Sequence, residues 1–309
     1  MYNIVNKINE LEIRTNENIG NSKSANTLRA YRSDIKSYET FCASLNLKPF
    51  PSEPKTVSLY ITHISETCKY STIKRKLAAI KITHSLSNMY LDLKNPIISQ
   101  NLNGIKKKIG IFQRAKKPLS IENLKKVVNI IDKEKKTEKK LRNKALILTG
   151  FCGAFRRSEL VDLNIEDLDF SKDGVKIFIK KSKTDQSGEG MIKAIPYLDN
   201  INICPVTNLK KWINYLNSNG QNKKKIFDMS DKNVALIIKR YIKSIGLDSN
   251  KYSGHSLRSG FATATAENGA EEREIMSMTG HKSSQMVRRY IHEGNLFQNN
   301  ALKKINQKF

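Results

Sequence analysis

Apolar residues recur at intervals of three and four along most of the chain, the spacing that places them on one face of an α-helix. The first such run follows Ser24 and contains Leu28, Tyr31, Ile35, Tyr38, Cys42 and Leu45. Three prolines between residues 49 and 54 end it, because proline has no backbone N–H and clashes with the preceding turn. The same spacing predicts helices around residues 57–64, from residue 71 and after Pro96. Residues 22–112 are therefore expected to form a helical domain.

Two polar segments flank this domain. Residues 1–21 are mostly polar, with Ile4, Ile8 and Leu11 as one short helical stripe, and we interpret them as an N-terminal extension. Residues 113–118 are mainly polar and basic and close on a proline, which is typical of a linker. A second domain is then expected over residues 119–309.

The second domain begins with helices and contains the main change of period. Ser120 is a good N-cap for an apolar stripe over residues 124–131, and the apolar run 141–151 predicts a buried helix. Alternation over residues 175–179 predicts a strand, with a turn at 183–188 and a return strand at 192–195. Helices are expected again around 209–216, 234–245, 256–267 and 271–278, then a short helix carrying Tyr290 and an amphipathic segment at 296–305. The predicted fold is mainly α with a small antiparallel β-sheet: a helical N-terminal domain and an α+β domain.

The charge of the chain narrows the choice of partner. Its 309 residues include 55 Lys and Arg against 29 Asp and Glu, a formal net charge of +26, which attracts polyanions and above all nucleic acid. A solvated, lysine-rich surface is the alternative. Basic residues recur on successive helices of the first domain, which favours a DNA-facing side. The residues expected there are Lys74, Arg75, Lys76, Lys81, Lys106, Lys107 and Lys108.

Cysteine usage and hydropathy indicate a compartment. The four cysteines form no C-x-x-C pair, which suits a reducing environment and disfavours a disulfide framework or a zinc site. No apolar run approaches the roughly 18 residues of a membrane span, and no signal-peptide pattern follows Met1. A cytoplasmic protein without a membrane or metal site is expected.

Four clusters in the second domain carry groups that can hold and attack a phosphodiester. Arg156 stands among apolar residues of what the pattern predicts to be one helix, where a salt bridge to the glutamate three residues on is the alternative role. His255 and Arg258 share a face in the first turn of a helix, where backbone N–H groups also attract phosphate. His281 follows a glycine, and Tyr290 comes nine residues later. Each cluster alone is a weak signal, since a lone tyrosine is more often part of a core.

Taken in order, these clusters follow a known pattern. The sequence carries R-x-S-E-L at 156–160, a lysine in the predicted β-turn, H-x-L-R at 255–258, G-H at 280–281 and then a tyrosine. In this order they resemble the tyrosine recombinase family, which includes phage integrases, the Xer recombinases and Cre. The resemblance covers residues 119–309 as the catalytic domain, and residues 22–112 are similar in kind to the family's core-type DNA-binding domain.

The resemblance implies a role for each group. The implied catalytic residues are Arg156, Lys183, His255, Arg258, His281 and the nucleophile Tyr290, with Glu159 in support. The two arginines would clamp the phosphate, His255 would act as general base, Lys183 would protonate the departing 5′ oxygen, and His281 would donate a hydrogen bond to a phosphate oxygen. Arg157 stands where the family usually has an apolar residue. Because adjacent helical residues point about 100° apart, only one of these two arginines can face the phosphate, and the motif spacing favours Arg156.

A member of this family would be a site-specific DNA recombinase. It would cut and rejoin strands through a 3′-phosphotyrosyl intermediate and a Holliday junction, giving integration, excision or resolution without a metal or cofactor. The implied partners are double-stranded DNA at the nucleoid, a homotetramer on paired sites and, where the system uses one, an accessory DNA-bending protein or second recombinase. The segment before residue 22 is too short for an additional arm-type DNA-binding domain, so a two-domain layout is expected.

Other functions fit parts of the sequence. A religating topoisomerase or resolvase-type enzyme would use the same chemistry, and a DNA-binding protein that has lost catalysis would share the fold. An RNA-binding module would explain the charge but not the ordered clusters. A metal-dependent nuclease needs clustered carboxylates, and the acidic run 166–169 is interpreted as a solvated strand edge or turn.

Overall fold

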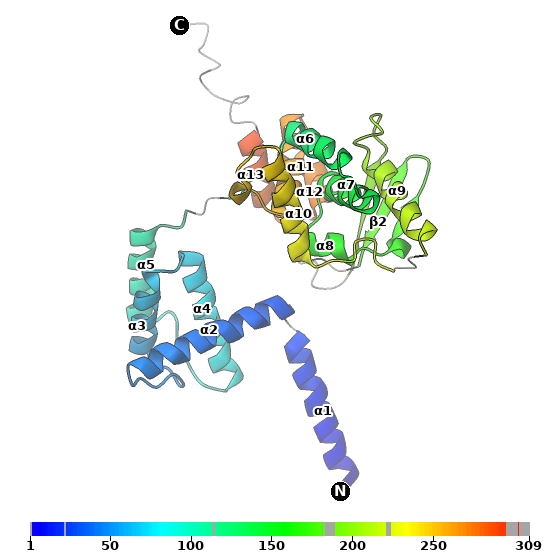
Figure 1. The fold of residues 1–309 in the computed structure, drawn as a ribbon. Helices are drawn as coiled ribbons and strands as arrows, with labels where there is room; N and C mark the ends of the chain where they lie inside the picture. Colours follow the sequence, from blue (N-terminus) through cyan, green and yellow to red (C-terminus); the bar gives the residue numbers. More distant parts are fainter. Residues whose placement is uncertain are drawn as a thin grey trace. The chain divides into compact units, whose positions relative to one another are not determined.

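The chain forms two compact units, Met1–Arg114 and Ala115–Phe309. The structure, a computed structural model, describes residues 2–21, 23–112, 115–180, 182, 189–220, 224–294 and 302 (Figure 1). Over these residues it is mostly helical with a small antiparallel sheet, which confirms the predicted fold class. None of the described helices combines the length and the apolar character that crossing a bilayer requires.

The first unit is made of helices. They are α1 (Tyr2–Asn21), α2 (Ala25–Ser44), α3 (Pro54–Ser65), α4 (Tyr70–Leu86) and α5 (Pro96–Ile109). The Ser24 side chain caps α2 by accepting a hydrogen bond from the backbone N–H of Thr27, as its position before the apolar run predicts. The core lies where α2, α3, α4 and α5 meet, around Tyr38, Tyr60 and Ile80. The α1 helix is longer than the predicted short stripe, and its Ile4, Ile8 and Leu11 are exposed.

The basic residues of the first unit differ in exposure. Lys74, Lys81 and the lysines at 106–108 are exposed, as predicted. Lys76 is not open to solvent: its Nζ donates to Ser37 Oγ at 3.0 Å and to Tyr60 Oη at 3.2 Å. The cause is the buried carboxylate of Asp34, which lies 3.7 Å from this Nζ and 2.5 Å from Nη1 of Arg75. The sequence pattern, which placed Lys76 with the solvent-facing residues of α4, missed this buried acid.

The second unit is built around α7. Its helices are α6 (Ile121–Asp132), α7 (Thr137–Cys152), α8 (Arg157–Asp162), α9 (Pro205–Ser218), α10 (Asp231–Ser244), α11 (His255–Glu267), α12 (Glu272–Thr279) and α13 (Ser284–Gly294), with 3₁₀ turns at Ile165–Asp167 and Ser249–Lys251. The α7 helix packs against α6, α8, α9 and α11. Residues 143–151 are therefore buried on every side of the helix, which explains the apolar run in the sequence.

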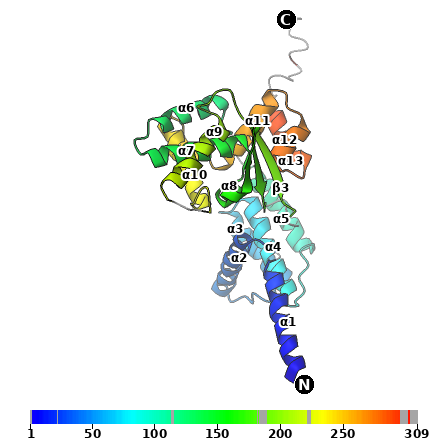
Figure 2. The same cartoon turned by 90° about the vertical axis from the view of Figure 1, so that its right-hand side faces the viewer.

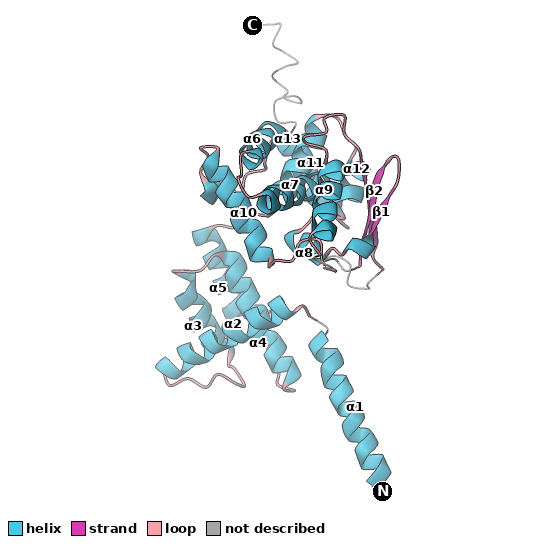
Figure 3. Cartoon of the chain, turned by 45° about the vertical axis from the view of Figure 1, so that its right-hand side comes forward, coloured by secondary structure: helices cyan, strands magenta, loops and turns pink. Residues whose placement is uncertain are grey.

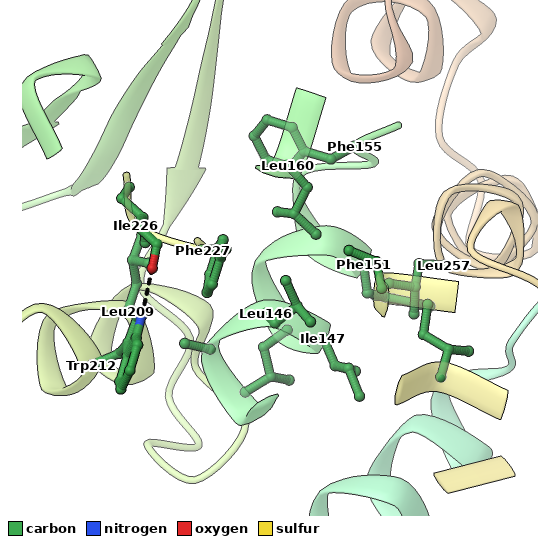
Figure 4. Packing of buried hydrophobic residues seen from close by; sticks show 14 of the residues in the cluster. Leu146, Ile147, Phe151, Phe155, Leu160, Leu209, Trp212, Ile226, Phe227 and Leu257 are labelled. Atoms are coloured by element: carbon green, nitrogen blue, oxygen red, sulfur yellow. Dashed lines mark hydrogen bonds between the residues drawn. The ribbon is translucent and has the colours of Figure 1, made fainter. Parts of the chain in front are cut away.

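Side chains from distant parts of the chain fill the core beside α7 (Figure 4). Leu209 and Trp212 of α9 lie on one side of Leu146 of α7, and Phe151 of α7 lies on the other side, beside Leu257 of α11. The indole Nε1 of Trp212 donates to the carbonyl oxygen of Ile226 at 2.9 Å, so the buried N–H of this large side chain is paired. On the other side, α11, α12 and α13 pack against one another and form one group, drawn in orange (Figure 2).

The sheet lies at one side of these helices (Figure 3). Its strands β1 (Leu168–Phe170), β2 (Gly174–Ile179) and β3 (Met191–Pro196) pair antiparallel in the order β1-β2-β3. The two strands predicted at 175–179 and 192–195 are confirmed. The acidic run 166–169, interpreted from the sequence as a solvated strand edge or turn, runs into β1 and is only partly solvated, because Asp167 is buried and its Oδ1 lies 2.7 Å from Lys180 Nζ.

Of three remaining predictions for the second unit, one is wrong and two lie largely or wholly outside the described residues. Arg156 does not stand inside a helix, because α7 ends at Cys152 and α8 begins only at Arg157. The predicted turn at 183–188 lies outside the described residues, and so does the amphipathic segment 296–305 apart from Leu302.

Candidate active site

A tight turn between α7 and α8 sets the position of Arg156. Ala154 has φ 49°, a left-handed conformation that costs a residue with a Cβ about 1–2 kcal/mol. Gly153 lies so close to the Phe155 ring that a Cβ there would come within 2.2 Å of it. This compact turn ends the long helix and places Arg156 at the N-cap of α8, where its backbone is extended.

Glu159 and Ser182 hold Arg156 in place. The backbone N–H of Arg156 donates to Glu159 Oε2 at 2.9 Å, and its Nη1 donates to Glu159 Oε1 at 2.5 Å and to Ser182 Oγ at 2.7 Å. Ser182 in turn donates to Glu159 Oε1 at 2.8 Å. Burial would raise the pKa of the Glu159 carboxyl, but the hydrogen bonds and the charge of Arg156 outweigh it and hold that pKa below its ordinary value. The carboxylate is therefore charged and orients the guanidinium.

Arg157 takes a different direction from its neighbour. Its Nη2 lies 3.5 Å from Asp231 Oδ2 on α10, and its side-chain stem packs over Gly254, where a Cβ would meet Arg157 Cδ at 2.0 Å. The two adjacent arginines thus separate, with Arg156 bound to Glu159 and Arg157 bound to the start of α10.

The α11 helix supplies His255 and Arg258 from its first turn, as predicted. Arg258 is 1% exposed, and its Nη1 donates to the carbonyl oxygen of Ala154 at 2.9 Å. Its Nη2 donates to His281 Nε2 at 3.1 Å. Burial and the charge of Arg156 lower the pKa of Arg258 to about 10, so the guanidinium stays protonated at neutral pH.

The hydrogen bonds around His281 fix its tautomer. Gly280 ends α12 with φ 62°, a left-handed C-cap that favours glycine, and His281 follows it. The Thr279 hydroxyl donates to the carbonyl oxygen of Ile275 at 2.6 Å, so it can only accept from His281 Nδ1, 2.9 Å away. Burial and the charges of Arg258 and Arg156 lower the pKa of His281 to about 4, so the ring is neutral. Its Nε2 carries no proton and accepts from Arg258.

Tyr290 lies on α13 with its hydroxyl against His255. The hydroxyl oxygen is 3.0 Å from His255 Nε2, and the ring packs among apolar residues of α11 and α12. Burial, and then the charges of Arg258, Arg156 and Arg157, lower the pKa of His255. A neutral imidazole at this distance can take the hydroxyl proton. The tyrosine and histidine that meet here belong to the same chain.

The structure therefore gathers most of the residues that the sequence singled out. Arg156, His255, Arg258, His281 and Tyr290 come together from the N-cap of α8, from α11, from the end of α12 and from α13. Lys183 lies outside the described residues.

Comparisons with known proteins identify this arrangement. The model of the family described as "Phage integrase family" matches residues 117–295. An "Integrase/recombinase xerD homolog" from Selenomonas ruminantium is 38% identical over 96% of this chain and 90% of its own length. The chain belongs to the phage integrase family. It is a tyrosine recombinase, a DNA breaking-and-rejoining enzyme of the site-specific recombinase class.

A further sequence relative agrees with this assignment, and two solved structures share the fold. The tyrosine recombinase XerC from Thermodesulfovibrio yellowstonii is 26% identical over 94% of this chain and 91% of its own length. The XerH site-specific recombinase, solved in a post-cleavage complex with palindromic difH substrate, shares the fold with a TM-score of 0.69 at 19% identity, over 89% of this chain and 78% of that chain. A lambda integrase tetramer bound to a Holliday junction matches with a TM-score of 0.58 at 16% identity, over 87% of this chain and 72% of that chain.

Sequence reasoning missed three polar residues that contact this site of the recombinase. They are Ser182, Thr279 and Lys193, which bind Arg156, His281 and the turn before Arg156 respectively. The sequence did indicate that Lys193 could be buried. It lies two residues from Ile195 on the predicted strand, so the two side chains must face the same side of the sheet. Ile192 gave the opposite signal, and in the structure it is 66% exposed while Lys193 is 1% exposed.

Proposed function

We propose that Tyr290 is the nucleophile of the recombinase and that His255 is its general base. The observation that carries this proposal is the 3.0 Å contact between the Tyr290 hydroxyl and His255 Nε2, beside the buried guanidinium of Arg258. The tyrosine oxygen attacks the phosphorus in line, and its proton passes to His255. The bond from phosphorus to the 5′ oxygen breaks, which leaves a 3′-phosphotyrosine and a 5′-hydroxyl. Attack by a 5′-hydroxyl of the partner strand reverses these steps and restores a phosphodiester.

The clamp on the phosphate is proposed to be Arg156 with Arg258. Two guanidinium groups can bind the non-bridging oxygens and stabilise the charge that develops on them in the transition state. Glu159 supports this role because it binds both the backbone and the guanidinium of Arg156. Lys183 is proposed, from the family resemblance, to protonate the departing 5′ oxygen.

His281 is proposed to enter the reaction in two stages. Without DNA, its Nε2 accepts from Arg258 and holds that guanidinium in place. An incoming phosphate competes for the same Arg258 N–H, and its negative charge favours protonation of the imidazole. A protonated His281 could then donate from Nε2 to a phosphate oxygen, which is the role that the family resemblance implies.

The proposed substrate is double-stranded DNA, bound by both units. The formal charge of +26 and the exposed lysines of α4 and α5 support contacts with the DNA backbone by the first unit. The lambda integrase structure is a tetramer bound to a Holliday junction, and we propose the same homotetrameric assembly on paired sites for this chain. We further propose that it acts in the cytoplasm on the nucleoid. A DNA-bending protein or a second recombinase is proposed as an accessory partner where the system uses one.

Recovery of the covalent intermediate from cells tests the proposal. Cells that express the recombinase would be lysed in denaturant, and DNA that stays attached to the protein would be sequenced. The expected result is enrichment of one short site in the wild type and none in Tyr290→Phe. Attached DNA without a common site would contradict site-specific exchange, and attached DNA in Tyr290→Phe would contradict the assigned nucleophile.

A further inference from the structure

Lys193 is a buried lysine that points at the backbone of the active site. It lies on β3, opposite Ile177 of β2, and it is 1% exposed. Its Nζ donates to the carbonyl oxygen of Gly153 at 2.6 Å and lies 3.4 Å from that of Ala154. The same Nζ lies over the Phe155 ring at 4.6 Å from its centre. One side chain thus contacts Gly153, Ala154 and Phe155, the three residues that precede Arg156 in the turn between α7 and α8.

The turn that Lys193 holds also anchors the second arginine. The carbonyl oxygen of Ala154 accepts from Arg258 Nη1 at 2.9 Å. Lys193 of β3 and Arg258 of α11 therefore contact the same carbonyl oxygen. The residue that follows the turn is Arg156. The left-handed Ala154 is intrinsically unfavourable and needs its surroundings to fix it.

We propose that Lys193 is a positioning residue of the recombinase: through the Gly153–Ala154 carbonyls it sets the spacing between Arg156 and Arg258. This inference rests on the proposed function of those two arginines as the phosphate clamp. Clamp geometry matters because a displacement of reacting groups by about 1 Å can cost about 10²-fold in rate.

The charges around Lys193 suit a residue that acts through the backbone. Burial lowers the pKa of Lys193 to about 7; Glu159 opposes this shift, while Arg258 and Arg156 add to it. The charge of Lys193 in turn helps to lower the pKa of His281. The amine also lies at the C-terminal end of α7, where the helix dipole favours a cationic donor.

Two substitutions of Lys193 and one matched control test the inference. Lys193→Met keeps an unbranched side chain that is one atom shorter and removes its donors, whereas Lys193→Arg keeps both charge and donors. Lys176→Met is the control, because Lys176 is an exposed lysine on the neighbouring strand β2. The readouts are hydrogen exchange of the peptide 153–159, affinity for DNA, and single-turnover cleavage of a nicked duplex that carries the site recovered with the wild-type adduct.

The expected outcome separates cleavage from binding. In Lys193→Met the turn should exchange faster and cleavage should fall by about tenfold or more, with DNA affinity changed by less than about threefold. Lys193→Arg should recover most of the rate, and Lys176→Met should behave as the wild type. Wild-type exchange and cleavage in Lys193→Met would overturn the inference, as would a folded Lys193→Arg that is no faster than Lys193→Met.

Two other results also bear on the inference: a Lys193→Met variant that does not fold, and a wild-type protein that forms no adduct. If Lys193→Met does not fold, the Lys193→Arg variant alone tests the inference. Hydrogen exchange of the turn and cleavage at wild-type rates in this variant support the inference, and faster hydrogen exchange of the turn overturns it. If the wild type forms no adduct at all, the proposed function fails, while the exchange of the turn still tests whether Lys193 holds it.

Discussion

At the scale of single residues, the site places a neutral histidine, His255, near charged guanidinium groups. Arg258, Arg156 and Arg157 are the cations that, together with burial, lower the pKa of His255. Two of these guanidinium groups, those of Arg258 and Arg156, form the proposed phosphate clamp, and they also help to keep the histidine free to accept a proton. The proposed general base is thus neutral at physiological pH.

The lowered pKa of His255 predicts the acid side of the pH profile. The base form is present above its pKa and is lost as pH falls through that pKa, which lies below the ordinary 6.5. The second-order rate constant for cleavage of the nicked duplex, measured well below saturation, reports the DNA-free enzyme. It should therefore stay above half of its maximal value at pH 6.5 and decline only at lower pH. His255→Gln should be slow throughout and lack this decline. A half-maximal point above pH 6.5 in the wild type would contradict the assignment.

Thr279 predicts a test of the His281 tautomer. Thr279→Val removes the acceptor for Nδ1–H, so the His281 ring loses the hydrogen bond that orients it toward Arg258 and the proposed phosphate position, and its proton is no longer confined to Nδ1. Cleavage should fall by about three- to tenfold, in line with the 0.5–1.5 kcal/mol typical of one hydrogen bond. Nitrogen chemical shifts of His281 should change from the Nδ1–H form in the wild type to a mixture. The control is Ser277→Ala, an exposed residue of α12 whose hydroxyl also donates to a backbone carbonyl. Unchanged shifts and unchanged cleavage in Thr279→Val would rule out this role.

At the scale of elements, the turn between α7 and α8 separates two adjacent arginines. Arg156 binds Glu159, whereas Arg157 pairs with the exposed Asp231. Arg156→Ala should therefore slow cleavage by at least about 10²-fold, as loss of a preorganised charge donor does. Arg157→Ala should change the rate by no more than about fivefold, because a surface ion pair contributes about 0–1 kcal/mol. The opposite ranking in a single-turnover assay would place Arg157 in the clamp.

The elements also show what the sequence could predict. Helices with capping residues and clear apolar stripes, such as α2 after Ser24 and α6 after Ser120, were predictable because local chemistry and burial agree. The end of α7 was not, because its break relies on a left-handed alanine that Lys193 and Arg258 hold through contacts remote in sequence. The sequence could not distinguish a strand from a turn at β1, because three residues carry too little alternation.

The candidate site also contains residues that the sequence could predict and residues that it could not. Its titratable groups could be found from the sequence, because their order along the chain resembles a family pattern. The residues that hold them could not, since a threonine, a serine or a strand lysine is common and acts only through its neighbours in space. Lys193 is the clearest case, because Ile192 and Ile195 give conflicting signals for which side of β3 is buried.

At the scale of the whole molecule, the two units carry different groups. The second unit carries the proposed reacting groups, and the first carries exposed lysines that suit a DNA backbone. Phosphate contacts supply affinity without sequence information, so the charge of +26 explains attraction to DNA but not the choice of site. That choice must come from groups that read base edges or DNA shape.

The most direct test of the central claim is the identity of the residue that becomes attached to DNA. Wild-type protein would be reacted with a nicked duplex labelled on the strand that keeps the 3′ phosphate, and the adduct would be digested and mapped by mass spectrometry. The expected result is one labelled peptide, modified at Tyr290, and no adduct with Tyr290→Phe. An adduct on another tyrosine, or one that survives Tyr290→Phe, would contradict it.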